Sequence, residues 1–225
     1  MFKKILFVTA ACLTASSSFA LSYYAGVGGG MSQNTENRNF AYIAQDGKQI
    51  SATPYKINGN GFLGEAYVGL GQRLNKFYVG GELGGFYSNA YTEQSTIYNT
   101  IHYSSKLTNP FGASLSALTG FYIAPNNMIY AKAGGVFSEF KGSSSPFAWH
   151  TGYTGSFQKF DAGGQFGLGL TSQFTKQLSL RVEGDYNKYR KFTKANKATA
   201  TQPIGSQTTY SPESMVLTVG LSYNF

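Results

Sequence analysis

Cysteine, charge and long apolar runs are all scarce in this sequence of 225 residues. The one cysteine, Cys12, lies within the first twenty residues, so the rest of the chain can form no internal disulfide. Only 12% of residues are charged, against about a quarter in ordinary soluble domains. After residue 20 no apolar run approaches the roughly 20 residues of a transmembrane helix, and no helical stripe recurs. These absences exclude a disulfide scaffold and a helical membrane protein, and they make an ordinary soluble domain a poor fit.

The first twenty residues have the layout of a secretory signal peptide. Lys3 and Lys4 precede an apolar stretch over residues 5–13, and small residues lead to Ser18-Phe19-Ala20. The apolar stretch is too short to span a bilayer. We therefore predict a cleavable leader over residues 1–20 and a single exported domain over residues 21–225.

The remaining chain is rich in strand and turn residues. Aromatic residues make up 16% of the sequence, and there are 28 glycines. Apolar and polar residues alternate with period two in eight segments, which predicts eight strands: 23–32, 61–74, 77–91, 111–124, 128–140, 160–174, 178–189 and 215–225. Three connections are tight turns, whereas the four others (33–60, 92–110, 141–159 and 190–214) are long and polar. Long and short connections alternate, which is typical of transmembrane barrels with short periplasmic turns and long outer loops.

The two faces of each expected strand favour such a barrel over a soluble β-sandwich. In residues 178–189, Leu180 and Val182 alternate with Arg181 and Glu183. The solvent face of a sandwich would normally carry more charge. Aromatic residues also gather near strand ends, where an interfacial girdle would lie: Tyr23, Tyr24, Phe62, Phe77, Tyr78, Tyr87, Phe121, Tyr122, Phe174 and Phe225. The predicted fold is all-β, an eight-stranded antiparallel up-and-down transmembrane β-barrel.

Over residues 21–225 this pattern resembles the small eight-stranded outer-membrane barrels of Gram-negative bacteria, the OmpA/OmpX-like and opacity-protein-like family. The resemblance implies a place in the bacterial outer membrane, among its lipids and lipopolysaccharide. It also implies that the last strand is an assembly signal read by the outer-membrane insertion machinery. The residues that would form this signal are Leu217, Val219, Leu221, Tyr223 and Phe225.

Charged residues on the expected inward faces predict a filled lumen. Eight strands leave an interior only wide enough for side chains. We expect cations and carboxylates to pair there as a polar plug: Glu65, Glu82, Lys132, Arg181, Glu183 and Asp185, with Asp161 and Gln165 nearby. The alternative is an ion path gated by exchanging salt bridges.

The sequence gives little support for a catalytic or cofactor-binding site. Enzymes on small outer-membrane barrels, such as those that modify lipid A, need a histidine near a serine or carboxylate. The two histidines, His102 and His150, fall in expected loops or at their margins. We predict no enzyme activity and no cofactor or metal, and keep a lipid A-modifying enzyme as a remote alternative.

A basic segment offers the one lead to a ligand. Five cations without an acidic neighbour in sequence follow the seventh expected strand: Lys188, Arg190, Lys191, Lys194 and Lys197. In an exported barrel they would meet lipopolysaccharide phosphates or host polyanions, and not nucleic acid; a merely solubilising loop is an equal alternative. The sequence thus predicts a structural or surface-adhesive barrel that presents four outer loops, with a small gated channel as the runner-up.

Overall fold

The structure is a computed structural model, and it describes residues 21–44, 46, 48–98, 101–144, 155–196 and 204–225. The described elements are strands, listed here in chain order: β1 (Ser22–Ala44), β2 (Gln49–Leu74), β3 (Phe77–Ser88), β4 (Tyr91–Tyr98), β5 (Ile101–Thr108), β6 (Phe111–Ala124), β7 (Asn127–Ser144), β8 (Gly155–Gln173), β9 (Leu178–Tyr189), β10 (Phe192–Asn196) and β11 (Ile204–Asn224). Within these ranges no helix has the length and apolar character needed to cross a membrane. The expected leader, residues 1–20, lies outside the described residues.

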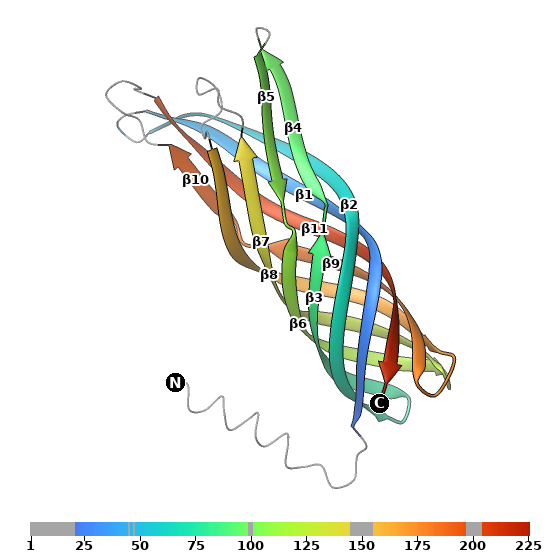
Figure 1. Cartoon of the computed structure of the whole chain (residues 1–225). Helices are drawn as coiled ribbons and strands as arrows, with labels where there is room; N and C mark the ends of the chain where they lie inside the picture. Colours follow the sequence, from blue (N-terminus) through green and yellow to red (C-terminus); the bar gives the residue numbers. More distant parts are fainter. Residues whose placement is uncertain (1–20, 45, 47, 99–100, 145–154, 197–203) are drawn as a thin grey trace.

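Eight of the strands form a closed antiparallel ring, which confirms the predicted fold class (Figure 1). The order around the ring is β7, β6, β3, β2, β1, β11, β9, β8, and the β7–β8 pairing closes it. β1 pairs with β11 from Tyr24↔Asn224 to Ala44↔Ile204. Closure gives every spanning strand two neighbours, so no backbone edge faces lipid.

The connections alternate as the sequence predicts. Tight turns join β2 to β3, β6 to β7 and β8 to β9, all at the end of the barrel where β11 finishes (Figure 1). Asn75 begins the first turn with φ of 60°, a conformation that Asn tolerates better than most residues. The longer connections lie at the opposite end, and that end is the outer one in this family of barrels.

The loops are shorter in the structure than the sequence predicts, because much of the chain assigned to them forms paired strands. β1 continues to Ala44 and β2 starts at Gln49, so most of 33–60 forms a ladder. β4 and β5 form a hairpin within 92–110, and β10 pairs with β11 within 190–214. These segments lack the apolar alternation that a lipid-facing strand requires. Their backbone groups are nevertheless satisfied by neighbouring strands, which is what fixes a strand.

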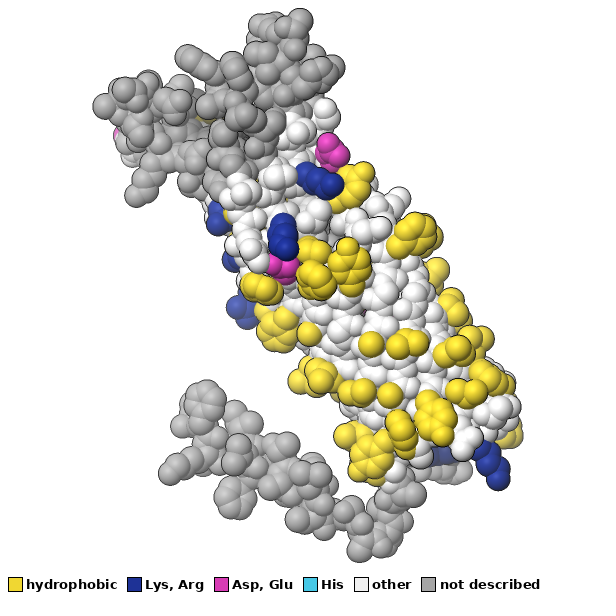
Figure 2. Space-filling view, viewed as in Figure 1, with side chains coloured by type: hydrophobic (Ala, Val, Ile, Leu, Met, Phe, Trp, Pro, Cys, Tyr) yellow, Lys and Arg dark blue, Asp and Glu magenta, His cyan; other side chains and the backbone are white. Residues whose placement is uncertain are grey.

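Apolar side chains cover the outside of the ring (Figure 2). Leu83, Leu115, Leu168 and Leu217 are between 56% and 62% exposed, as expected for side chains that meet lipid. Seven of the ten aromatics assigned to the girdle are exposed on this face: Tyr23, Phe62, Phe77, Tyr87, Phe121, Phe174 and Phe225.

Three aromatics assigned to the girdle face inward instead. Tyr24, Tyr78 and Tyr122 line a cavity inside the barrel. Each directly follows an outward aromatic, and successive residues of a strand point to opposite faces. Only one aromatic of each pair can therefore reach the lipid.

Candidate functional site: the filled lumen and the basic rim

A charged cluster occupies the middle of the lumen. Its side chains come from the inward faces of three strands of the ring, Glu82 on β3, Lys132 on β7, and Arg181, Glu183 and Asp185 on β9. All five residues are buried, with exposed fractions between 1% and 7%. The structure thus brings together five of the six charged lumen residues that the sequence singled out; we call these five the lumen network.

Arg181 ties opposite walls of the barrel together. Its guanidinium donates to both carboxylate oxygens of Glu82, at 2.5 and 3.0 Å, and also to Glu183. The guanidinium carbon lies 4.3 Å from the ring centroid of Tyr67. Because β3 and β9 are not neighbours in the ring, this bidentate pair spans the interior.

Lys132 is the second cation of the lumen network. Its ammonium contacts Glu183, lies 3.2 Å from Asp185 Oδ2 and 3.7 Å from Glu82 Oε1. The hydroxyl of Tyr130 donates to Glu183 at 2.5 Å, and that of Tyr24 donates to Glu82 at 3.0 Å. Buried carboxylates that share cations and hydroxyl donors in this way avoid the cost of an unpaired charge.

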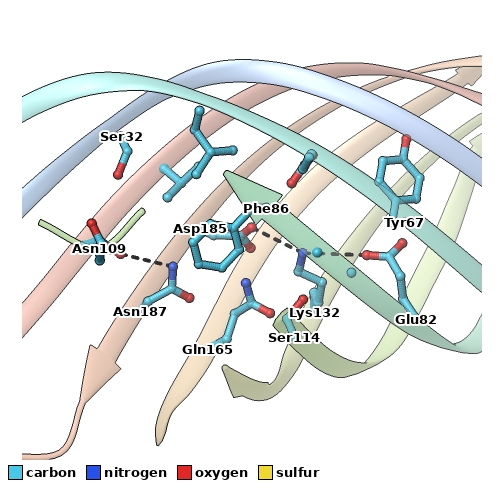
Figure 3. A pocket seen from close by; sticks show the side chains of 16 residues that line it. Ser32, Tyr67, Glu82, Phe86, Asn109, Ser114, Lys132, Gln165, Asp185 and Asn187 are labelled. Carbon is cyan, nitrogen blue, oxygen red and sulfur yellow. Dashed lines mark hydrogen bonds and ion pairs between the residues drawn. The ribbon is translucent and has the colours of Figure 1, made fainter. Parts of the chain in front are cut away.

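The other expected lumen residues lie beside the lumen network without joining it. Glu65 makes no ion pair with a described residue, and lines a space of about 20 Å³ together with Lys132 and Asp185 (Figure 3). Gln165 accepts a hydrogen bond from Ser116 at 2.9 Å. Asp161 pairs with Lys159 at 2.7 Å, nearer the outer end.

A second buried ion pair was missed by sequence reasoning. Glu36 and Arg38 on β1 pair at 2.5 Å and are 1% and 3% exposed. Thr92 donates to Glu36 at 2.8 Å, and Arg38 donates to Ser105 at 2.8 Å. Both charged residues lie in the segment assigned to a loop. The local sequence carries no signal for this pair, because the residues between Asn34, Glu36 and Arg38 are polar as well.

An aromatic core lies above the lumen network, towards the outer end. It contains Leu107, Val136, Phe140, Tyr189, Phe192 and Tyr210, each at most 6% exposed. We call these six residues the outer core. Phe140 meets Tyr189 edge to face at 4.9 Å, and Phe192 stacks on Tyr210 at 5.0 Å. Tyr189 and Phe192 flank the exposed Arg190 and Lys191 in the chain. They point inward instead, because water surrounds the barrel at this level and apolar rings are buried away from it.

The basic segment is not the open loop that the sequence suggested. Lys188, one residue before the end of β9, faces outward and pairs with Glu213 of β11 at 3.2 Å, so it does have an acidic neighbour in the fold. The Lys194 ammonium lies 5.1 Å above the ring of Phe157. Arg190 and Lys191, in the break between β9 and β10, are exposed. Lys197 lies outside the described residues.

The residues of the expected assembly signal share the outer face of β11. Leu217, Val219, Leu221, Tyr223 and Phe225 are between 43% and 80% exposed, and Tyr223 meets Phe225 edge to face at 5.2 Å. Phe225 N donates to Tyr23 O at 3.0 Å, which holds the last residue against β1.

His102 falls within β5, in a hairpin at the outer end of the barrel. His150 lies outside the described residues.

Comparisons with known proteins agree with this architecture. The model of the OmpA-like transmembrane domain family matches residues 20–225. No curated protein matches the chain. Among solved structures, Ail, the attachment invasion locus protein of Yersinia pestis, is 14% identical, with 88% of this chain and 98% of Ail covered and a TM-score of 0.39. Ail in complex with the heparin analogue sucrose octasulfate is 15% identical, with 88% and 99% covered and a TM-score of 0.37.

The outer membrane protease OmpT of Escherichia coli is 8% identical, with 93% of this chain and 99% of OmpT covered and a TM-score of 0.50. At such identity the likeness concerns the fold alone, and OmpT's protease activity does not transfer. The closed ring of eight strands and the family match lead to one conclusion: this chain belongs to the OmpA-like transmembrane domain family and is a β-barrel of the bacterial outer membrane.

Proposed function

We propose that this protein is a closed, non-conducting membrane anchor that carries a paired-strand platform for adhesion above the outer membrane. The observation that carries this proposal is the length of the strands relative to the bilayer. β1 has 23 residues, about 75 Å of strand at 3.3 Å per residue. Tilted by about 45°, it rises about 50 Å, twice the roughly 25 Å of the apolar band of such barrels.

The filled lumen supports an anchor and disfavours a channel. The lumen network and the outer core fill successive levels of the interior. The space beside Lys132 and Asp185 measures about 20 Å³ and the space beside Phe140 and Tyr189 about 10 Å³, whereas a larger cavity lies only beyond Arg181, at the turn end. The first two spaces hold a single water at most, so they leave no room for a hydrated ion. We therefore expect purified barrel in a planar bilayer to conduct no current. A steady conductance of wild-type protein would favour the gated channel instead.

Exposed cations at the outer rim suggest what the platform binds. Lys188, Arg190 and Lys191 are exposed around the end of β9, and Lys141 on the outer end of β7 is 48% exposed. Lipopolysaccharide phosphates and sulfated or carboxylated surface glycans are the polyanions within reach of such a rim. Dispersed exposed cations give modest affinity that falls with salt, because screening acts over about 8 Å at physiological ionic strength.

A pair of matched triple variants tests this rim. Replacing Lys188, Arg190 and Lys191 with glutamine removes three cations at the outer end. Replacing Arg73, Lys76 and Lys176, which are exposed at the turn end, removes the same number and kinds of charge. We expect only the first variant to lose binding to immobilised heparin and to lipopolysaccharide at low salt. Equal binding by both variants would contradict a polyanion-binding rim and leave the anchor role to stand alone.

A further inference from the structure

We propose that the cavity at the turn end of the barrel binds a small aromatic carboxylate that enters from the periplasm. This cavity lies on the other side of the lumen network from the outer core and measures about 260 Å³. For comparison, a protein cavity of about 150 Å³ holds benzene. The space therefore fits one aromatic ring with a charged substituent.

The cavity exists because tyrosine rings lie flat against the barrel wall. Tyr24 lies over its cross-strand partner Gly69, and Tyr130 over its partner Gly169. A Cβ on either glycine would overlap the ring beside it. Glycine in a strand often marks such a close approach, and here it keeps the rings out of the centre of the lumen.

The rest of the wall offers apolar contact to a flat ring. Tyr78, Leu118, Met128 and Tyr130 form one buried cluster, each at most 8% exposed, with Tyr122 packed against it. All five line the cavity. Aromatic faces, a thioether and a leucine side chain suit a planar apolar ligand.

The charged side chains that line the cavity are all positive. Among the described lining residues, the only charged side chains are Arg73, Lys176 and Arg181; there is no Asp or Glu. The carboxylates of Glu82 and Glu183 lie behind the tyrosines, because they accept the hydroxyls of Tyr24 and Tyr130. A ligand in the cavity therefore faces cations and rings, and not the acids of the lumen network.

Arg181 stands at the inner end of the cavity. Arg181 is 4% exposed, and its Nε makes no hydrogen bond, although its two terminal nitrogens bind Glu82 and Glu183. A buried, unsatisfied donor on a cation is costly unless an acceptor meets it. The Nε atom is closed off from the cavity, so a ligand meets Arg181 through its positive charge, and a singly charged carboxylate suits this arrangement.

The mouth of the cavity carries the other two cations. Arg73 stacks on Tyr122, with its guanidinium carbon 3.8 Å from the ring centroid, and donates to Asn75 O at 2.8 Å and Pro125 O at 3.3 Å. These contacts hold the guanidinium over the entrance, between two turns. With Lys176 it attracts an anion into the cavity, towards the positive charge of Arg181.

Fluorine NMR on the whole protein in lipid nanodiscs tests the proposal. The probe is 4-fluorobenzoate; 4-fluorobenzyl alcohol and 4-fluorobenzylammonium are the uncharged and cationic controls, and empty nanodiscs correct for partition into lipid. We expect saturable line broadening of the benzoate only. Broadening no greater than in empty nanodiscs, or equal for all three probes, would overturn the proposal.

Variants that fill the cavity locate the site. Leu118→Trp and Thr171→Trp each place an indole in the space, and we expect either to weaken benzoate binding by at least about tenfold. Arg73→Gln with Lys176→Gln is expected to weaken it about fivefold, as for exposed charge pairs. Lys48→Gln, an exposed cation at the opposite end, is expected to change nothing. If Leu118→Trp fails to fold, Thr171→Trp decides; wild-type affinity in a folded cavity-filling variant would overturn the proposal.

Discussion

The membrane half and the outer half of this barrel differ in the side chains that they turn outward. In the membrane half, Leu180 and Val182 face out while Arg181 and Glu183 face in. In the outer half, Tyr189 and Phe192 face in while Arg190 and Lys191 are exposed. The change occurs within a few residues of the end of β9, on a sheet that continues without interruption through β11.

The difference follows from what surrounds each half of the sheet, lipid around the membrane half and water around the outer half. Lipid accepts apolar side chains, so the membrane half can put its charges inside, where they pair. Above the bilayer the same sheet meets water, and its apolar side chains collapse inward as in an ordinary protein core. The centre of the membrane half therefore depends on the lumen network, whereas the outer half depends on the outer core together with the buried Glu36–Arg38 pair. Substitutions in the lumen network and in the outer core can separate the two.

The largest effect is expected in the membrane half, from Arg181→Ala. The change leaves Glu82 without its bidentate partner and removes one of the two cations that contact Glu183. Breaking a buried pair in this way costs about 3–5 kcal/mol in the free energy of unfolding. The urea midpoint of folded barrel, read from the heat-modified gel shift, measures this change.

An exposed ion pair provides the control for Arg181. Lys188→Ala breaks the contact with Glu213, in which the lysine side chain is 63% exposed. We expect no change in its urea midpoint. If Arg181→Ala and Lys188→Ala behaved alike, the lumen network would be accessible to water and the ionic account of the membrane half would fail.

The outer half is expected to respond locally to loss of an aromatic ring. Phe140→Ala removes a side chain of the outer core that is 2% exposed. Truncating a buried phenylalanine to alanine costs about 3–5 kcal/mol in the free energy of unfolding. We expect faster amide exchange in the outer parts of β7, β8 and β11, with the urea midpoint of the membrane half changed little.

Phe137→Ala is the matched control on the same strand. Phe137 is 59% exposed on the lipid-facing side, three residues before Phe140. Its loss is expected to leave amide exchange in the outer half unchanged. If amide exchange in the outer half were equally slow in Phe140→Ala and in Phe137→Ala, the outer half would not depend on the outer core.

The sequence predicted the membrane half well because lipid imposes a simple rule there. The ranges 111–124 and 178–189 match β6 and β9 to the residue. Apolar residues must recur at every second position when one face meets lipid, and the tight turns mark the strand ends. The same rule brought Glu82, Lys132 and Arg181 onto the inward face, and pairing followed from the narrow lumen.

The outer half could not be predicted in the same way. When both faces of a strand carry polar residues, period two gives no signal, and pairing depends on neighbours far away in the chain. Glu36 and Arg38 show this clearly, because their partners Thr92 and Ser105 come from a hairpin and lie 56 and 67 residues later in the chain. The inward turn of Tyr189 and Phe192 depends on where the membrane ends, which the local sequence does not state.

The smallest effect on the folded barrel, and the sharpest separation of assembly from stability, is expected for Phe225. Its ring is 80% exposed at the edge of the apolar face, beside Tyr223. A charged residue near the membrane interface costs about 0–1 kcal/mol, so Phe225→Asp is expected to unfold at nearly the wild-type urea midpoint. If the outer face of β11 is the signal that the insertion machinery reads, the yield of folded barrel in cells falls nonetheless. Phe225→Tyr keeps an aromatic ring and is expected to assemble normally. Pulse-chase labelling with the heat-modified gel shift measures both variants, and wild-type insertion of Phe225→Asp would show that the signal does not depend on this residue.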